Sequence, residues 1–214
     1  MSNKESFTSQ INFFSKYYRV IAPDFTGFGQ SKKMEYAYRL SDYVNEIKQL
    51  IKTLNVDRLD VVAHSFGARV ALKLIADGGK IDKLVITGGA GLKPKRSLKY
   101  YFKVYYYKIL KKLFPNKAFK NFGSVEYRAL DKVMKQSYIY IVNEHLDGIL
   151  SQIKTKTLIL SGDCDKQTPP YMQKRLNRNL KNSTLTFLKG EGHFAFVTKP
   201  YTFNLLAREF LLGE

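Results

Sequence analysis

The sequence lacks the features that would cross-link the chain or carry it into a membrane. It contains one cysteine, Cys164, which excludes an internal disulfide and is typical of a protein kept in a reducing cytoplasm. No run approaches the roughly 18 apolar residues of a membrane-spanning helix. Residues 1–6 also lack the apolar stretch of a secretory signal. We therefore expect a cytoplasmic protein.

Acidic residues are scarce, and their absence is sharpest in one segment. The 214 residues carry a formal net charge of +18, and the stretch from Lys93 to Lys120 holds ten Lys and Arg residues with no Asp or Glu. More than half of the excess charge therefore lies there. A basic excess can serve nucleic acid, an anionic membrane surface or solubility alone. We find no nucleic-acid-binding motif, so we expect no nucleic-acid partner.

Apolar residues make up 44% of the chain, which is enough for one domain with a real core. Five runs rich in Val, Ile, Leu and Thr are continuous rather than alternating, which predicts parallel strands covered on both faces. These runs are Arg19–Ala22, Leu59–Ala63, Lys83–Thr87, Thr157–Ser161 and Thr184–Leu188.

Helical patterns separate the predicted strands. Residues 40–54 carry one apolar stripe at helical spacing, with Ser41 placed to cap the helix and Asp42 in its first turn. Further helices are predicted after Gly67, from Pro170 onward and at the C-terminal end. Strands that alternate with helices predict an α/β fold, with a mostly parallel sheet and helices on both faces.

Residues 91–150 interrupt this alternation with helical patterns and no convincing strand. We interpret them as a helical lid inserted into a core formed by residues 1–90 and 151–214. One stripe at helical spacing consists of Leu98, Phe102, Tyr105, Ile109 and Leu113. We favour a lid that covers a pocket while its lysines face water. Contact with an anionic membrane surface is the alternative. It is not favoured, because one stripe cannot fully cover a pocket and insert into lipid at once.

A strand, a serine and a helix are predicted to meet at Ser65. The segment Val61–Ala68 indicates the end of a strand, a sharp turn and the start of a helix. Such a strained turn needs small residues two positions before and after the serine, and Ala63 and Gly67 meet that need. Phe66 would offer its backbone N–H at the helix start, where an anion is favoured. A plain helix-capping serine is the alternative.

Two further candidates lie just beyond predicted strands. Asp163 and Asp165 follow the fourth strand, where a carboxylate can reach an imidazole across the edge of the sheet. His193 follows the last strand, in a loop that Gly190 and Gly192 allow to bend. Taken alone, each has a more ordinary alternative, namely a solvated Asp in a turn and a surface histidine.

Ser, then Asp, then His, each at the end of a predicted strand, is the chain order of the α/β-hydrolase family. The sequence resembles that family from about Phe7 to the C-terminal end. The loop Asp24–Ser31, with the pattern Asp-x-x-Gly-x-Gly-x-Ser, is similar to the one found before the family's nucleophile. The resemblance implies an α/β-hydrolase fold whose lid is the helical insertion.

The resemblance also implies the roles of the site residues. Ser65 matches the nucleophile, and His193 matches the base that takes its proton. Asp165 rather than Asp163 matches the acid, because the acid in this family usually stands three residues after the glycine that ends the strand. The Phe66 N–H matches an oxyanion donor.

The expected activity is cleavage of a small ester, or of a related acyl or carbon–carbon bond beside a carbonyl, through an acyl-serine intermediate. The partner is a small-molecule substrate, and neither a metal nor an organic cofactor is implied. A non-catalytic relative that binds a small ligand, or an inactive fragment, is the alternative. The sequence does not indicate the oligomeric state.

The chain departs from the family at its beginning. The family normally carries two or three earlier strands, and the last of them would lie between Arg19–Ala22 and Leu59–Ala63. Without it, many buried backbone groups would lose partners, at roughly 1–3 kcal/mol each. We expect that Met1 is internal to a longer reading frame. The alternative is a rearranged sheet in which the two flanking strands pair directly.

Overall fold

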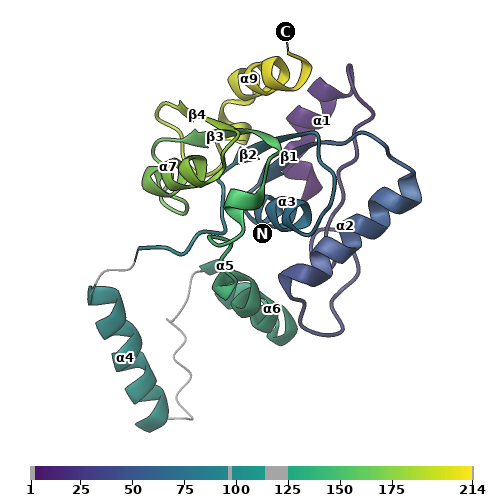
Figure 1. Cartoon of the computed structure of the whole chain (residues 1–214). Helices are drawn as coiled ribbons and strands as arrows, with labels where there is room; N and C mark the ends of the chain where they lie inside the picture. The colour runs from purple at the N-terminus through teal and green to yellow at the C-terminus, as the bar shows by residue number, and fades with distance from the viewer. Residues whose placement is uncertain (1–2, 96–97, 114–124, 214) are drawn as a thin grey trace.

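The computed structural model describes residues 3–95, 98–113 and 125–213. Its sheet has four strands, and neighbouring strands are parallel in the order β1-β2-β3-β4 (Figure 1). The strands are β1 (Asp60–His64), β2 (Lys83–Thr87), β3 (Lys156–Gly162) and β4 (Ser183–Leu188). Four of the five predicted strands are thereby confirmed to within one residue at either end.

The fifth prediction, a strand at Arg19–Ala22, is wrong. This segment is irregular, and Val20 and Ile21 expose 37% and 40% of their surface. Its β-branched residues suit a strand, but a strand also needs a hydrogen-bonded neighbour. Within the described residues β1 pairs only with β2, so Arg19–Ala22 does not pair with β1 directly. The rearranged sheet is thus not formed, and the longer reading frame stays a prediction.

Helices cover both faces of the sheet, as predicted. On one face α2 (Leu40–Leu54), α3 (Phe66–Ala76) and α7 (Pro170–Asn179) pack against residues that include Leu84 and Ile86. On the other face α1 (Thr8–Phe14) and α9 (Pro200–Leu212) pack against Val85, Leu158 and Leu160. Successive residues of a strand point to opposite faces, so the continuous apolar runs supply both cores.

Helix α2 begins one position earlier than a Ser41 cap requires. Leu40 is already helical and fully buried, so Arg39 is the N-cap residue and Ser41 lies inside the first turn. The Asp42 carboxylate accepts a hydrogen bond from the Arg39 N–H at 2.6 Å. The prediction that Ser41 caps the helix is therefore wrong, whereas Asp42 does stabilise the first turn.

The described part of residues 91–150 contains helices and no strand. The helices are α4 (Leu98–Leu113), α5 (Val125–Ala129), α6 (Lys132–Asn143) and a short 3₁₀ turn, η2 (Leu150–Gln152). The remaining short elements of the chain are η1 (Lys4–Phe7) and α8 (Ala195–Thr198). The end of α6 is joined to α3, because the Arg69 guanidinium donates to the carbonyl oxygens of Ile141 and Glu144 at 2.8 and 2.9 Å.

No helix among the described residues combines the length and the apolar character needed to cross a bilayer.

Candidate active site

Ser65 occupies a strained turn between β1 and α3. Its φ of 47° and ψ of −102° lie where side-chain-bearing residues are rarely found, and Asn55 is the one other non-glycine residue with positive φ in the described chain. The Ser65 N–H donates to the Thr87 carbonyl at the end of β2, 3.0 Å away, which ties the turn to the sheet. Ser65 stands at the N-cap position of α3, yet its side chain makes no capping hydrogen bond. Helix capping therefore does not explain the serine.

Phe66 is the first residue of α3, so its backbone N–H has no acceptor within the helix. The ring of Phe66 is held among other aromatic rings. Its centroid lies 4.9 Å from that of Tyr43, 5.4 Å from that of Phe25 and 5.5 Å from that of Phe28. This packing fixes the first turn of α3 and with it the direction of the N–H group.

Asp165 and His193 form a buried hydrogen-bonded pair. The distance from His193 Nδ1 to Asp165 Oδ2 is 2.8 Å, and the Asp165 residue is only 3% exposed. The carboxylate also accepts from the Gln167 N–H, the Thr168 N–H and the Thr168 hydroxyl, at 2.7, 2.9 and 2.7 Å. Burial raises the pKa of Asp165, but the hydrogen bonds from His193 and Thr168 outweigh it and hold the pKa at about 2.

Asp163 has a different partner. Its carboxylate accepts the Gly190 N–H at 2.7 Å and so holds the loop that follows β4. The Cys164 N–H donates to the Glu191 carbonyl at 2.8 Å in the same loop. The structure thus brings His193 to Asp165 and leaves Asp163 as a support for the backbone.

His64 lies beside the pair, although the sequence indicated only that it adjoins Ser65. Its Nε2 is 3.0 Å from the His193 carbonyl oxygen, and the two imidazole centroids are 4.6 Å apart. Burial and then the neighbouring His193 lower the pKa of His64 to about 4. A neutral His64 can donate from Nε2 to that carbonyl, which fixes the backbone of His193.

Sequence reasoning missed His64 and Thr168 as supports of the pair. The Thr168 contacts could have been found, because an Asp commonly accepts from backbone and hydroxyl groups two and three residues later in a turn. The His64 contact joins residues 129 positions apart in the chain, and no local signal marks it.

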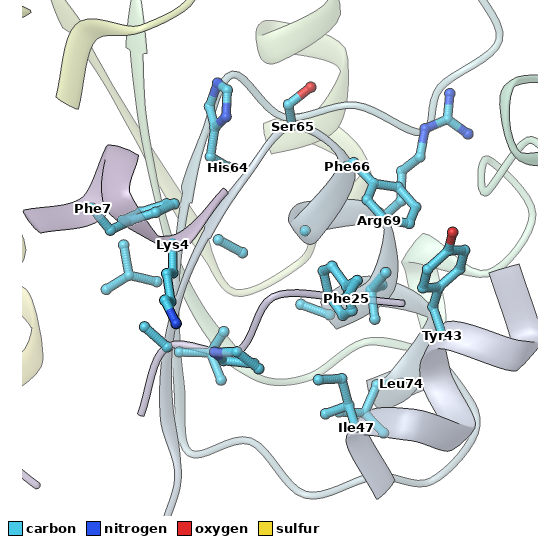
Figure 2. Close-up of a pocket in the computed structure, with 18 of the residues that line it drawn as sticks. Lys4, Phe7, Phe25, Tyr43, Ile47, His64, Ser65, Phe66, Arg69 and Leu74 are labelled. Carbon is cyan, nitrogen blue, oxygen red and sulfur yellow. The ribbon is translucent and has the colours of Figure 1, made fainter. Parts of the chain in front are cut away.

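A cavity of about 1520 Å³ opens beside these groups. Ser65, Phe66 and His193 line one part of it, and residues 19–25 and 58–64 line another. Consecutive residues of β1 line it, so the outer edge of β1, and not only one of its faces, borders the hollow. In Figure 2 Ser65 and His64 stand next to each other with the Ser65 hydroxyl pointing away from the His64 ring, at the opposite end of the view from Ile47 and Leu74.

Ser65 and His193 share this cavity wall without a hydrogen bond between them. The Ser65 hydroxyl makes no hydrogen bond to any described residue. The described residues also contain no cluster of three or more His, Cys, Asp and Glu side chains that could hold a metal ion. The arrangement therefore consists of a serine on a strained turn, an imidazole with a buried carboxylate behind it, and a helix N-terminus.

Comparison with known proteins agrees with this arrangement. A family model described as the alpha/beta hydrolase fold matches residues 2–119, and a second, described as TAP-like protein, matches residues 142–213. The first model spans more than half of the chain, and the chain therefore belongs to the alpha/beta hydrolase family.

The relatives carry hydrolase names. The chain is 27% identical to the AB hydrolase superfamily protein YisY of Bacillus subtilis, over 97% of this chain and 87% of that protein. It is 26% identical to a putative carbamate hydrolase, RutD, of Serratia proteamaculans, over 95% and 84% of the two chains. An esterase from Exiguobacterium antarcticum has the same fold, with a TM-score of 0.77 at 21% identity over 98% and 87%. The two sequence relatives support a hydrolase, and the esterase shows the fold alone.

Proposed function

We propose that the protein is a serine hydrolase that cleaves a small ester, or a related acyl or carbon–carbon bond beside a carbonyl, with Ser65, His193 and Asp165 as its triad. The observation that carries the proposal is the buried Asp165–His193 pair at 2.8 Å, whose His193 lines the same cavity as the strained Ser65. The hydrolase names of the relatives support the class of reaction.

The proposed mechanism follows from which atoms are already engaged. His193 Nδ1 is bonded to Asp165, so Nε2 is the nitrogen that takes the Ser65 proton as Oγ attacks the carbonyl carbon. The resulting oxyanion accepts the Phe66 N–H at the start of α3. His193 then gives its proton to the leaving group. In the second half of the reaction His193 takes a proton from water as the water attacks the acyl-serine, and then returns that proton to Ser65 Oγ. Asp165, ionised above about pH 2, stabilises the imidazolium.

In this proposal residues 91–150 form the lid over a core of residues 1–90 and 151–214. Met134, Ser137 and Ile141 of α6 line the cavity. Arg69 lies on α3, one helical turn after Ser65. Its two hydrogen bonds hold the end of α6 close to the start of α3. Helix α6 is thus the part of the lid that contacts the substrate.

Two observations favour a second candidate, a non-catalytic protein that binds a small ligand. The Ser65 hydroxyl and His193 make no hydrogen bond, and a cavity of about 1520 Å³ exceeds the roughly 300–1,000 Å³ of most small-molecule sites. Catalytic hydrogen bonds are often long in unliganded enzymes, however, so the triad remains the better account.

A fluorophosphonate probe separates the two candidates, because labelling requires an activated serine. We expect labelling at Ser65, found by mass spectrometry, together with turnover of a short p-nitrophenyl ester. Ser65→Ala should abolish labelling and lower turnover on the order of a millionfold. Ser151→Ala, at an exposed serine that does not line the cavity, should change neither labelling nor turnover. An unlabelled protein that binds ligands would support the second candidate.

A further inference from the structure

Helix α4 presents a row of large apolar side chains to solvent. Phe102, Tyr105, Tyr106, Ile109 and Leu113 are spaced by three, one, three and four positions, which places them along one side of the helix. All five are exposed, from 39% for Ile109 to 73% for Phe102. Single exposed apolar residues are ordinary, but a contiguous row marks an interaction surface. We call this row the α4 stripe.

The α4 stripe does not cover the cavity beside Ser65. None of its five residues lines that cavity, and Figure 1 shows α4 set apart from the sheet and the helices packed on it. On the opposite side of the helix, Val104 and Tyr107 are half-buried. The stripe is therefore open to solvent and does not cover the cavity beside Ser65. The objection that one stripe cannot serve both a pocket and a lipid surface no longer applies.

Lysines accompany the stripe, and α4 contains no Asp or Glu. At about 100° per residue, Lys99 and Lys112 fall near the two margins of the stripe, and Lys103, Lys108 and Lys111 lie farther round the helix. Aromatic rings favour the headgroup level of a bilayer, and cations on the same helix favour anionic headgroups. A basic helix with an exposed aromatic side fits that chemistry on both counts.

We propose that α4 docks on an anionic lipid surface, with the α4 stripe inserted among the headgroups and its lysines pairing with their charges. This surface lies outside the triad cavity, so the inference does not depend on the proposed hydrolysis. A second copy of the chain, packing stripe against stripe, is the competing occupant that the test must separate.

Vesicle sedimentation gives the first measurement. The full chain should pellet with vesicles of phosphatidylcholine and phosphatidylserine at low salt, and should stay in solution with phosphatidylcholine alone. Raising the salt to the physiological range shortens the Debye length to about 8 Å and should release most of the protein. Recovery in the supernatant with phosphatidylserine at low salt would overturn the proposal.

Matched variants identify the surface. Neutralising the two lysines at the margins of the stripe together (Lys99→Gln with Lys112→Gln) should weaken binding about 25-fold, because each cation near an anionic surface contributes about fivefold. The control, Lys52→Gln with Lys174→Gln, removes two exposed charges from α2 and α7. Its binding should stay within about threefold of that of the unaltered protein. Equal losses would show that net charge, and not α4, holds the protein on the vesicle.

A tryptophan reporter tests insertion, since the chain has none of its own. The emission of Phe102→Trp should shift to the blue with phosphatidylserine vesicles, whereas that of Tyr201→Trp, at an equally exposed position on α9, should not. A blue shift of Phe102→Trp that grows with protein concentration in the absence of lipid would assign the α4 stripe to self-association and overturn lipid docking.

Discussion

The two ends of the sheet differ in how completely their polar groups are satisfied. Beyond β3 and β4, the Asp165 carboxylate accepts four hydrogen bonds, and His193 is held between Asp165 and His64. Beside β1, Ser65 is strained, its hydroxyl has no partner among the described residues, and the outer edge of the strand borders a large cavity.

The difference shows that the acid–base half of the site is built from local chain and the nucleophile half is not. Three of the four bonds to Asp165 come from residues within three positions of it, and the fourth comes from His193 in the loop after the adjacent strand. The surroundings of Ser65 depend on α1, α2 and the segment from residue 19 to residue 25, which meet only in the folded chain. Changes beyond β3 and β4 should therefore have sharp, local effects on activity.

The largest expected effect on this comparison is at Asp165. Asp165→Asn should lower kcat for a p-nitrophenyl ester about 10⁴-fold, because the amide no longer holds the required tautomer of His193. Asp163→Asn should cost less than about tenfold, since the amide oxygen can still accept the Gly190 N–H. Steady-state kinetics of both variants decide the assignment. A larger loss in Asp163→Asn would move the acid to Asp163.

His64 joins the two ends, and its effect should appear in stability against pH. Its pKa is about 4 in the folded protein and about 6.5 in an unfolded chain, so the unfolded state binds the extra proton between these values. The free energy of unfolding should therefore fall by about 3 kcal/mol as the pH falls from 6.5 to 4, and His64 should cause no further change in it above about pH 7. His64→Gln should flatten that slope in urea titrations.

An NMR titration checks the same prediction directly. The imidazole Cε1–H resonance of His64 should change with a midpoint near pH 4. A midpoint near 6.5 would mean that the ring is hydrated and that its contact with the His193 carbonyl does not persist in solution.

Gly162 tests how tightly the His193 loop is held against β3. A Cβ at this position would overlap the backbone carbonyls of Glu191 and Gly192, so Gly162→Ala must displace the loop. A displacement of about 1 Å at a catalytic group costs on the order of a hundredfold in rate. Gly192→Ala is the matched control, because its Cβ would enter open space at an ordinary φ. Comparable losses in the two variants would contradict this packing.

Much of the fold could be predicted because its signals are local. The runs that became β2 and β3 are apolar on both faces, and α7 begins at the proline that the pattern indicated. Arg19–Ala22 has the same β-branched character, but its pairing depends on a neighbour that sequence pattern does not reveal. Four strands were therefore predictable, and the irregular segment was not.

The candidate site divides in the same way. The spacing of Asp165 and His193 after their strands could be read from family resemblance, and the structure brings them into contact. The contact of His64 with the His193 carbonyl, and the absence of a bond from the Ser65 hydroxyl to His193, depend on how distant segments pack. Local pattern identified the groups, whereas their mutual distances needed the folded chain.

The smallest expected effect concerns α2, which borders the cavity on the β1 side. Asp42→Ala removes the carboxylate that accepts the Arg39 N–H at 2.6 Å and should lower the free energy of unfolding by about 1 kcal/mol. Ser41→Ala lies inside the first turn, where alanine is the better helix former, and should be neutral or slightly stabilising. Urea unfolding of the two variants measures the difference. If Ser41→Ala were the more destabilising change, Ser41 and not Arg39 would cap α2 in solution.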